Sequence, residues 1–352
     1  MKSRRPVGYA VVGLGTISQI AVLPAFGHTQ RSRLVALVSG DKDKAQRLAE
    51  KFGAPAHYEY RDYDACLGRP DIDAVYIATP TGAHEDGAVR AAKAGKHVLC
   101  EKPLAATVAE GRRMVKACRS QQVRLMTAYR KYFEPASVAL KQIVKSGELG
   151  RVDVMHTLFS EFRYAGDNSP GWLFDRKLAG GGSMMDLGVY CVNTSRWLID
   201  EDPLRASALH WAHDRKRYRE VEEGVAFRLD FPSGAMVQGT STYGCVMTSF
   251  LTVHGEKGWA SLCQAYLYEQ ERRLLVESAS RRFEKTYGVI DEFALELDAF
   301  SKCIREGRDP EPDGHEGLKD LVIVEAIYRS ARTGRPAPIR YPSLNSKERA
   351  AA

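Results

Sequence analysis

The sequence predicts an α/β part with a doubly wound parallel sheet, followed by an α+β part built on an open, mainly antiparallel β-sheet. Up to about residue 130, apolar strand-like runs alternate with helical patterns, which is typical of a parallel sheet. Beyond that point, short β-rich segments are separated by glycine and proline turns, which favours antiparallel pairing. A chain of 352 residues also suits two domains better than one core. We therefore expect an N-terminal domain at residues 1–130 and a C-terminal domain at residues 131–352.

Composition narrows the classes of function. The chain is 44% hydrophobic and 27% charged, and it has no apolar run of about 18 residues that could cross a membrane. Its seven cysteines are scattered and include no C-x-x-C pair, which argues against disulfides or a metal site and favours a reducing compartment. The basic N-terminus leads into a strand-like run rather than a secretory segment, so we expect a cytoplasmic location. An export signal trimmed from the chain is the open alternative.

The positive charge raises the question of an anionic partner. A net charge of +7 suits either an anionic small molecule or a nucleic acid. We interpret the basic runs at residues 215–219, 272–273 and 281–282 as solvated loops between strands, and no nucleic-acid-binding motif accompanies them. A small-molecule ligand is therefore expected, and a nucleic-acid partner is not.

The first predicted strand ends in a glycine-rich turn that opens a helix. In this context a G-x-G pattern indicates a dinucleotide-binding Rossmann fold. Gly13 permits the tight turn, and Gly15 lets the backbone approach a pyrophosphate. The helix that starts near Thr16 and Ile17 offers free N–H groups to that phosphate. Ser18 replaces the third glycine of the pattern and is small enough for close packing. A turn of this kind without a ligand is the alternative.

The second predicted strand ends where Rossmann folds bind the adenosine ribose. The neutral residues Ser39 and Gly40 stand there, and Lys42 or Lys44 can supply a positive charge for a 2′-phosphate. We therefore expect NADP rather than NAD. Asp41 leaves NAD open, because an acidic residue at this place can bind the ribose 2′-hydroxyl.

Three further strands are expected to end at the same edge of the sheet, where open α/β sheets bind ligands. The strand at residues 74–78 is followed by Thr79, Pro80 and His84, and this histidine is either a ligand contact or a satisfied residue of a helix start. The strand at residues 124–127 should bring residues 129–132 to the crevice.

Between these two strands lies the stretch that points most clearly to chemistry. The predicted strand at residues 97–100 delivers Glu101, Lys102 and Pro103 to the crevice. The proline restricts the backbone before it, so the lysine is expected to be aimed rather than mobile. A solvated charged strand end is the alternative.

In the second domain, three glycines at residues 180–182 precede a helix predicted to run to about residue 199. Ser183 can cap this helix. Asp186 and Tyr190 are four positions apart and therefore share one helix face. This pattern indicates an acid–base arrangement, with a structural Asp–Tyr contact as the alternative. The sequence also predicts strands at residues 152–162, 206–213, 224–231, 235–243, 250–254 and 258–263, and helices at 135–146, 293–305 and 318–333.

Together these motifs resemble the Gfo/Idh/MocA family of nucleotide-dependent oxidoreductases. The matching stretches are Gly13-Leu14-Gly15, Thr79-Pro80 with His84, residues 94–103, and the three glycines with Asp186 and Tyr190. Within the family the likeness is greatest to glucose–fructose oxidoreductases, which resemble this chain at residues 38–40, at Lys44 and at Tyr190. Many other members, such as inositol dehydrogenases, carry His in place of Tyr190. Such relatives often carry Arg after the tryptophan that matches Trp172, so a basic contact is either lost here or shifted to Arg176.

The resemblance implies a role for each of these residues. Lys102 would lie beside the nicotinamide, Tyr190 would act as acid/base, and Asp186 would orient Tyr190 and contact the sugar. Ser39 and Lys44 would bind the 2′-phosphate. The implied cofactor-binding residues are Gly13, Gly15, Thr16, Ile17, Ser39, Gly40, Lys44, Thr79, Pro80, His84, Glu101, Lys102 and Arg130. The implied substrate-binding residues are Lys102, Tyr129, Trp172, Arg176, Asp186 and Tyr190, and no metal is expected.

The resemblance also implies a reaction, which is hydride transfer between a nicotinamide and a pyranose carbon. Tyr190 would exchange the proton of the sugar hydroxyl, and the nearby charge of Lys102 would lower the pKa of its phenol. A cyclic polyol dehydrogenase or keto-sugar reductase is one alternative, and a non-catalytic NADP-binding sensor or regulator is another. The second sheet is expected to pair subunits into a homodimer or homotetramer.

Overall fold

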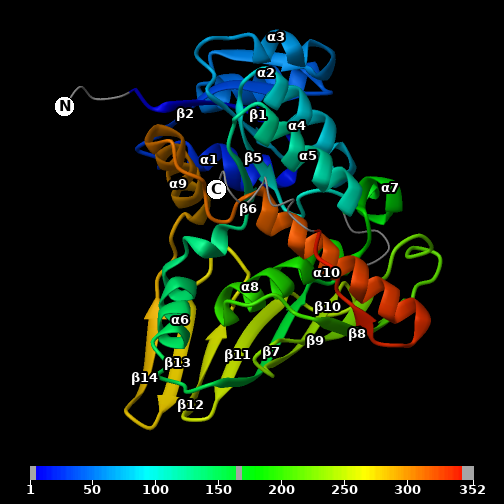
Figure 1. Ribbon diagram of the computed structural model, residues 1–352. Coiled ribbons are helices and arrows are strands. Elements are labelled where there is room, and N and C mark those ends of the chain that lie inside the picture. Colours follow the sequence, from blue (N-terminus) through cyan, green and yellow to red (C-terminus); the bar gives the residue numbers. More distant parts are fainter. Residues whose placement is uncertain (1–4, 164–168, 343–352) are drawn as a thin grey trace.

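The computed structural model describes residues 5–163 and 169–342, and it contains two sheets at opposite ends of the molecule (Figure 1). The N-terminal sheet has six parallel strands in the order β3-β2-β1-β4-β5-β6. This order has its switch point between β1 and β4, where Rossmann folds bind their ligands. The strands are β1 (Val7–Val12), β2 (Ser32–Ser39), β3 (Ala56–Glu59), β4 (Ala74–Ile77), β5 (His97–Glu101) and β6 (Leu125–Ala128).

Helices cover both faces of this sheet, because its central strands are apolar on both sides. One face packs against α3 (Tyr63–Leu67), α4 (His84–Lys93) and α5 (Val108–Ser120). The other face packs against α1 (Leu23–Ala25), α2 (Lys42–Phe52) and α9 (Glu292–Glu306). Helix α9 comes from the C-terminal part of the chain, so the division of the chain at residue 130 stays a prediction.

The second sheet has nine strands in the order β14-β13-β12-β11-β7-β10-β9-β8-β15. All neighbours pair antiparallel except β7 and β10, which run parallel. The predicted fold class is therefore confirmed. The strands are β7 (Val152–Ser160), β8 (Arg205–Trp211), β9 (Gly224–Asp230), β10 (Met236–Thr242), β11 (Thr248–Gly255), β12 (Gly258–Cys263), β13 (Arg272–Ser278), β14 (Arg282–Tyr287) and β15 (Ala337–Pro338).

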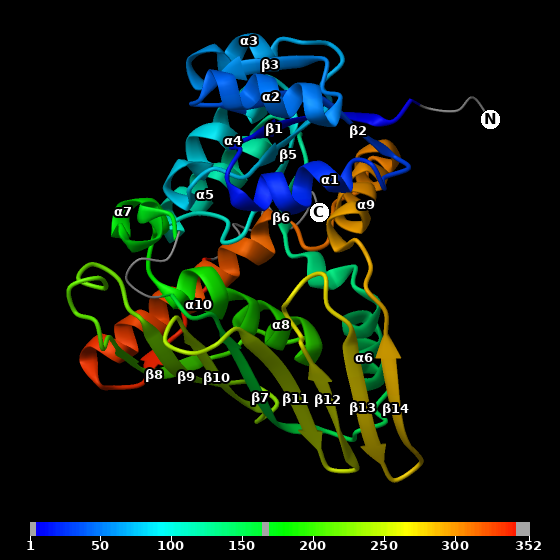
Figure 2. The same cartoon turned by 180° about the vertical axis from the view of Figure 1, so that it is seen from behind.

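Three helices lie on the face of the second sheet that is turned toward the first (Figure 2). They are α6 (Pro135–Lys145), α8 (Val189–Ile199) and α10 (Gly314–Thr333). The short helix α7 (Arg176–Ala179) leads into the three glycines. Within the described residues no helix covers the opposite face of this sheet, and none has the length and apolar character that crossing a membrane requires.

The interpretation of the basic run at residues 272–273 as a solvated loop is wrong, because both residues lie in β13. Arg281 and Arg282 are exposed, with Arg281 in the turn before β14 and Arg282 at its first position. The side chain of Arg272 is buried and forms an ion pair with Glu292. A buried arginine is tolerated here because a carboxylate from α9, distant in the sequence, neutralises it. The run at residues 215–219 does lie in a loop.

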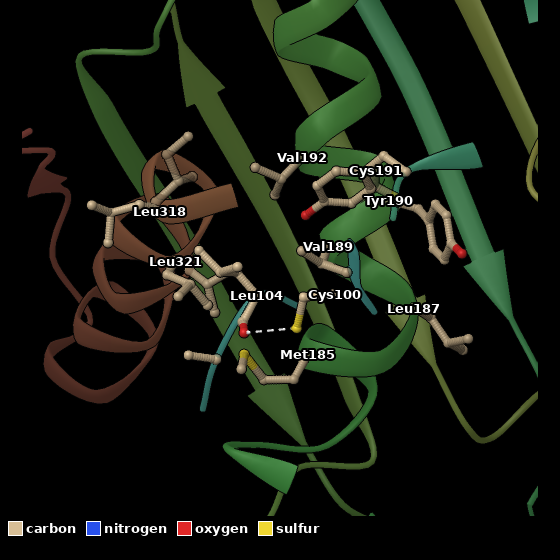
Figure 3. Close-up of a cluster of buried hydrophobic side chains, with 14 of the residues drawn as sticks. Cys100, Leu104, Met185, Leu187, Val189, Tyr190, Cys191, Val192, Leu318 and Leu321 are labelled. Carbon is tan, nitrogen blue, oxygen red and sulfur yellow. Dashed lines mark hydrogen bonds between the residues drawn. The ribbon is translucent and has the colours of Figure 1, made fainter. Parts of the chain in front are cut away.

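The segment that carries Asp186 and Tyr190 is anchored to both halves of the molecule (Figure 3). A wide helical turn, Met184–Gly188, continues into α8. Figure 3 shows Met185 and Val189 packed among Leu104, which follows β5, and Leu318 and Leu321 of α10. This apolar packing fixes the helix relative to β5, which Lys102 directly follows.

Candidate active site

A cavity of about 910 Å³ lies between the carboxyl ends of the parallel strands and the helical segment of the second domain. Its volume is at the upper end of the range for small-molecule sites. The residues predicted for a site that line it are Gly13, Gly15, Thr16, Ile17, Ser39, Gly40, Lys44, Thr79, Pro80, His84, Glu101, Lys102, Arg130, Trp172, Asp186 and Tyr190. Tyr129 and Arg176 do not line it.

The glycine-rich turn at the end of β1 is shaped by two different requirements. Gly13 has a φ of +95°, and a Cβ atom there would lie 2.5 Å from the carbonyl oxygen of Ala78. A Cβ atom at Gly15 would meet nothing within 4 Å, so this side of the turn is open to the cavity. The Ser18 hydroxyl donates to the Gly13 carbonyl at 2.6 Å and closes the turn. The turn therefore fits the close approach of a pyrophosphate.

At the end of β2, the Asp41 carboxylate caps a helix, whereas Lys44 lines the cavity. The Asp41 carboxylate accepts a hydrogen bond from the Lys44 backbone N–H at 2.9 Å and caps α2. The Ser39 hydroxyl is buried and accepts from the Asp41 N–H at 3.1 Å. Lys44 lines the cavity, together with Tyr60, which packs beside Gly40.

Beyond β4, the loop combines a free hydroxyl with a satisfied histidine. Thr79 Oγ1 is buried and has no hydrogen-bond partner among the described residues. His84 is buried, with Nδ1 3.1 Å from the Pro103 carbonyl and Nε2 3.0 Å from the Thr79 carbonyl. Burial lowers the pKa of this imidazole. These contacts favour the satisfied histidine over a ligand contact, while Thr79 offers a polar group to a ligand. Together with the open turn at Gly15, this lining fits a nicotinamide dinucleotide.

Lys102 and Asp186 form an ion pair across the two domains. Lys102 Nζ lies 3.0 Å from Asp186 Oδ1 and 2.7 Å from the Asp186 carbonyl oxygen. The Tyr243 hydroxyl donates to Asp186 Oδ2 at 2.9 Å. Burial alone would raise the pKa of the Asp186 carboxyl, but Lys102 and Arg163 hold it below its usual value. Burial would likewise lower the pKa of Lys102, but Asp186, Tyr190 and Glu101 keep it above its usual value. Both groups are therefore charged at neutral pH.

The Tyr190 hydroxyl has a different partner from the one the sequence suggested. Arg130 Nη1 donates a hydrogen bond to it, whereas Lys102 Nζ lies over the ring, 5.0 Å from its centroid. Asp186 is occupied by Lys102 and Tyr243, so it orients the lysine rather than Tyr190. Burial raises the pKa of the Tyr190 phenol, against the opposing charges of Arg130 and Lys102.

The other residues that follow β6 do not all face the crevice as expected. Tyr129 is buried behind the site, with its ring at 78° to that of Tyr190. Lys131 is buried against Glu292, and Tyr132 stacks on Trp197. In this segment only Arg130 lines the cavity.

The three glycines permit close packing against neighbouring segments. A Cβ atom at Gly182 would lie 1.9 Å from the Glu222 carbonyl oxygen, and one at Gly181 would lie 2.0 Å from the Tyr328 hydroxyl. The Glu222 carboxylate accepts from the N–H groups of Gly182 and Met184. The expected cap does not form, because the Ser183 hydroxyl hydrogen-bonds with the Ser241 carbonyl instead.

Sequence reasoning missed the residues that follow β7 and β10. Glu161 and Arg163 line the cavity after β7, and Tyr243 reaches Asp186 after β10. The two strands run parallel, so their carboxyl ends meet at one edge. The signal was a polar residue directly after each strand, but the expectation of antiparallel pairing hid it. Within the described residues, no group of three or more His, Cys, Asp or Glu side chains could hold a metal ion.

Comparison with known proteins places this site in a family. Residues 7–129 match the model of an oxidoreductase family with an NAD-binding Rossmann fold, and residues 137–261 match the GFO/IDH/MocA C-terminal domain. The chain is 30% identical to D-xylose 1-dehydrogenase [NADP(+)] of Haloarcula marismortui, covering 93% of this chain and 92% of that one. It is 28% identical to 1,5-anhydro-D-fructose reductase of Ensifer adhaerens, covering 94% and 98%.

A solved structure gives a similar result. The aldose–aldose oxidoreductase of Caulobacter crescentus, crystallised with glycerol, superposes with a TM-score of 0.89 and 38% sequence identity, covering 95% of this chain and 100% of that one. The expectation of the family is thus confirmed on both sequence and structure. The chain belongs to the GFO/IDH/MocA family of oxidoreductases, and its N-terminal part is the family's NAD-binding Rossmann fold.

Proposed function

We propose that this protein is an NADP-dependent sugar oxidoreductase, which transfers hydride between the nicotinamide and a pyranose carbon. The reaction would be aldose oxidation to an aldonolactone, ketose reduction, or both in turn, as in glucose–fructose oxidoreductases. The observation that carries the proposal is the convergence of Lys102 and Tyr190, from different domains, at one cavity. The similarity to an aldose–aldose oxidoreductase and to a D-xylose 1-dehydrogenase supports the choice of a sugar.

The cofactor would be held mainly by backbone and small side chains. Gly13, Gly15, Thr16 and Ile17 would hold the pyrophosphate. Ser39, Gly40 and Lys44 would hold the ribose and its 2′-phosphate, since the Asp41 carboxylate is engaged as the cap of α2. The nicotinamide end would lie against Thr79, Pro80, Glu101, Lys102 and Arg130, and His84 would hold the Thr79 loop in place through its carbonyl contacts. A bound nicotinamide ring supplies the hydride acceptor in oxidation and the hydride donor in reduction.

Lys102 and Tyr190 would divide the work on the substrate hydroxyl. An ammonium group has three N–H donors, and Asp186 receives two from Lys102, so the third can bind the hydroxyl oxygen. In oxidation the Tyr190 oxygen takes the hydroxyl proton as the C–H hydride leaves the carbon, and in reduction it returns that proton. Trp172 and Asp186 line the sugar side of the cavity. Tyr129 and Arg176 are not part of this proposal, because neither lines it.

Substitution of Lys102 and, separately, of Tyr190 tests the proposal. Lys102→Ala and Tyr190→Phe should each keep cofactor binding, measured by nicotinamide fluorescence, and lose turnover by about 10²- to 10⁴-fold. Turnover close to that of the wild type in both variants would contradict it. A screen of aldoses and polyols for a gain of NADPH fluorescence, and of ketoses for its loss, then identifies the substrate class. A gain with polyols alone would favour the cyclic polyol dehydrogenase. Reoxidation by keto-sugars without oxidation of aldoses would favour the reductase, which the similarity to 1,5-anhydro-D-fructose reductase supports.

Assembly and location complete the proposal. The outer face of the second sheet exposes Leu209 and Phe250 beside a shallow groove that Leu158 also lines. We propose that two subunits pair through this face, in a homodimer or homotetramer, which sedimentation analysis of the wild type and Leu209→Glu tests. A cytoplasmic location is proposed because all seven cysteines are free thiols.

A further inference from the structure

Arg130 occupies an unusually fixed position beside the Tyr190 hydroxyl. Its side chain is buried, and its guanidinium lies 4.9 Å from the ring of Tyr190, 5.3 Å from that of Phe293 and 5.4 Å from that of Tyr268. Nη1 donates to the Tyr190 hydroxyl oxygen, and Nη2 donates to the Tyr266 carbonyl at 2.7 Å. Arginine can only donate, so the Tyr190 oxygen is the acceptor of this bond whether or not the phenol carries its proton.

Lys102 is placed for a different task. Its ammonium group contacts the carbonyl and the carboxylate of Asp186 and lies over the face of the Tyr190 ring, not beside the hydroxyl. A cation over a ring face is attracted by the π electrons. The phenol oxygen, where the negative charge of a phenolate is concentrated, faces the guanidinium instead.

We propose that Arg130, rather than Lys102, is the cation that stabilises the deprotonated form of Tyr190, and that Glu292 is the positioning residue that holds Arg130 in place. The inference rests on the proposed function, because it takes Tyr190 as the acid/base. A guanidinium is suited to this task, since it keeps its charge when buried and presents a rigid set of donors.

Glu292 is the centre of a buried charge cluster that reaches Arg130. Its carboxylate lies 3.1 Å from Arg130 Nε and 2.8 Å from Lys131 Nζ, and it also pairs with Arg272 of β13. Arg272 lies 3.8 Å from a second buried carboxylate, Glu134. Three basic side chains thus share two buried carboxylates, and Arg130 is paired with Glu292 at Nε while its Nη1 reaches Tyr190.

The charges that face Tyr190 come from several elements. Burial raises the pKa of its phenol, as do the carboxyl groups of Glu101 on β5 and Glu296 on α9. Arg130 and Lys102 lower it. Asp186, one turn earlier, forms an ion pair with Lys102 and accepts a hydrogen bond from Tyr243, and the Tyr76 hydroxyl donates to Glu101. Only a close cation can offset burial and two carboxyl groups, and Arg130 is the one in direct contact with the oxygen.

The test is the pH profile of kcat/KM for sugar oxidation. Activity requires the deprotonated phenol, so the rate rises with pH through the pKa of Tyr190. In Arg130→Met this rising limb should move up by about one pH unit or more, which lowers the rate below the limb by about tenfold per unit. Arg130→Lys, which keeps the charge, should recover part of the shift. Lys102→Met should lower the rate over the whole range and move the limb less than Arg130→Met does.

The positioning role of Glu292 has its own readout. Glu292→Gln should move the limb in the same direction as Arg130→Met but by less, while Glu292→Asp should restore it in part. Thermal unfolding and the dissociation constant for NADPH are measured on every variant, so that a folding defect or a lost cofactor contact is recognised. If Glu292→Gln does not fold, Glu292→Asp and Arg272→Lys give the same comparison.

The possible results separate the inference from the function on which it rests. An unmoved limb in Arg130→Met, or a larger movement in Lys102→Met, would overturn the inference. So would a loss of NADPH affinity in Arg130→Met without a movement of the limb. Full activity of Tyr190→Phe would instead overturn the proposed function. An inactive Tyr190→Phe with an unmoved limb in Arg130→Met would refute the inference alone.

Discussion

The two walls of the cavity depend on different features of the chain. The wall from the N-terminal sheet includes the glycine-rich turn, where Gly13 has no room for a side chain and the space beside Gly15 opens to the cavity. The wall from the second domain presents Asp186, whose carboxylate is held by Lys102 of the first wall and by Tyr243. The difference teaches where each wall is vulnerable. Added atoms should damage the first wall, and removed charges should damage the second.

The largest effect is expected from removal of a charge in the second wall. Asp186→Asn keeps the shape of the side chain but leaves Lys102 without its anionic partner. The pKa of Lys102 should then fall, because Asp186 is the main group that keeps it high against burial. We expect kcat for sugar oxidation to fall by about 10²-fold or more, since the lysine can no longer bind the substrate hydroxyl as a fixed cation.

Tyr243→Phe is the matched control for that change. It removes one hydrogen bond to the Asp186 carboxylate but leaves the charge of the carboxylate in place. A hydrogen bond to a charged group contributes about 1.5–3 kcal/mol, so a loss of about tenfold is expected. If both variants lose the same activity, the charge of Asp186 is not what matters, and the contrast between the walls fails on this side.

Added atoms test the first wall. Gly15→Ala should fold normally, because nothing lies within 4 Å of the new Cβ atom, but it should weaken NADPH binding by about tenfold or more by blocking the pyrophosphate. Gly13→Ala should instead reduce the free energy of unfolding by about 1–3 kcal/mol, since its φ is +95° and the Ala78 carbonyl is in the way. Urea unfolding and fluorescence titration of both variants distinguish the two effects. Normal NADPH binding by Gly15→Ala would mean that the dinucleotide does not approach this turn.

A pH effect on stability is expected from Lys131, which lies behind the second wall beside Arg130. Burial lowers the pKa of Lys131 to about 7, with Arg130 and Arg272 adding to it against the attraction of Glu292. Between about pH 7 and the ordinary pKa of 10.5, the unfolded chain holds a proton on this amine that the folded chain lacks. The free energy of unfolding should therefore rise with pH over this window, by at most about 1.4 kcal/mol per pH unit.

Lys131→Met removes this contribution. Urea unfolding at pH 7.5 and 9 should show the wild type gaining stability relative to the variant as the pH rises. A constant difference between the two proteins would show that Lys131 stays charged up to its ordinary pKa. The charge balance around Glu292 would then need revision.

The sequence could predict the residues of the site that belong to local patterns, but not the partners that hold them. Gly13, Lys102 and the Asp186–Tyr190 pair were found because each belongs to a local pattern: a turn after a strand, a charge before a proline, and a helix face. The partner of each group was not found, because it depends on contacts between distant segments. Arg130 reaches Tyr190, 60 residues away, and Tyr243 reaches Asp186, 57 residues away.

Arg272 shows the same limit from the other side. In the sequence it is part of a basic run that looks solvated, and nothing local distinguishes it from an exposed arginine. It is buried because β13 carries it to Glu292 at the start of α9. The domain folds were predictable from periodicity, whereas the neutralisation of buried charge is a property of the tertiary structure.

The smallest effect is expected from Lys44, at the adenosine end of the first wall. Lys44→Gln should weaken NADPH binding by about tenfold, or 1.4 kcal/mol, because the proposed contact to the 2′-phosphate is lost. NADH binding should not change. Lys42→Gln is the matched control, since Lys42 is exposed and does not line the cavity. Fluorescence titration with both nucleotides gives the comparison, and equal losses for NADPH and NADH in Lys44→Gln would contradict the phosphate contact.

Asp41 is the acidic residue at this end of the wall that could bind the ribose of NADH. Its carboxylate caps α2 through the Lys44 N–H, so it is expected to serve the backbone and not the ribose. Asp41→Ser keeps a good cap and removes the charge, and it should leave NADH affinity unchanged while NADPH binding stays the same or improves. A fall in NADH affinity alone would mean that Asp41 binds the ribose 2′-hydroxyl. In that case the preference for NADP would rest on Lys44 against a competing acidic side chain at the same end of the wall.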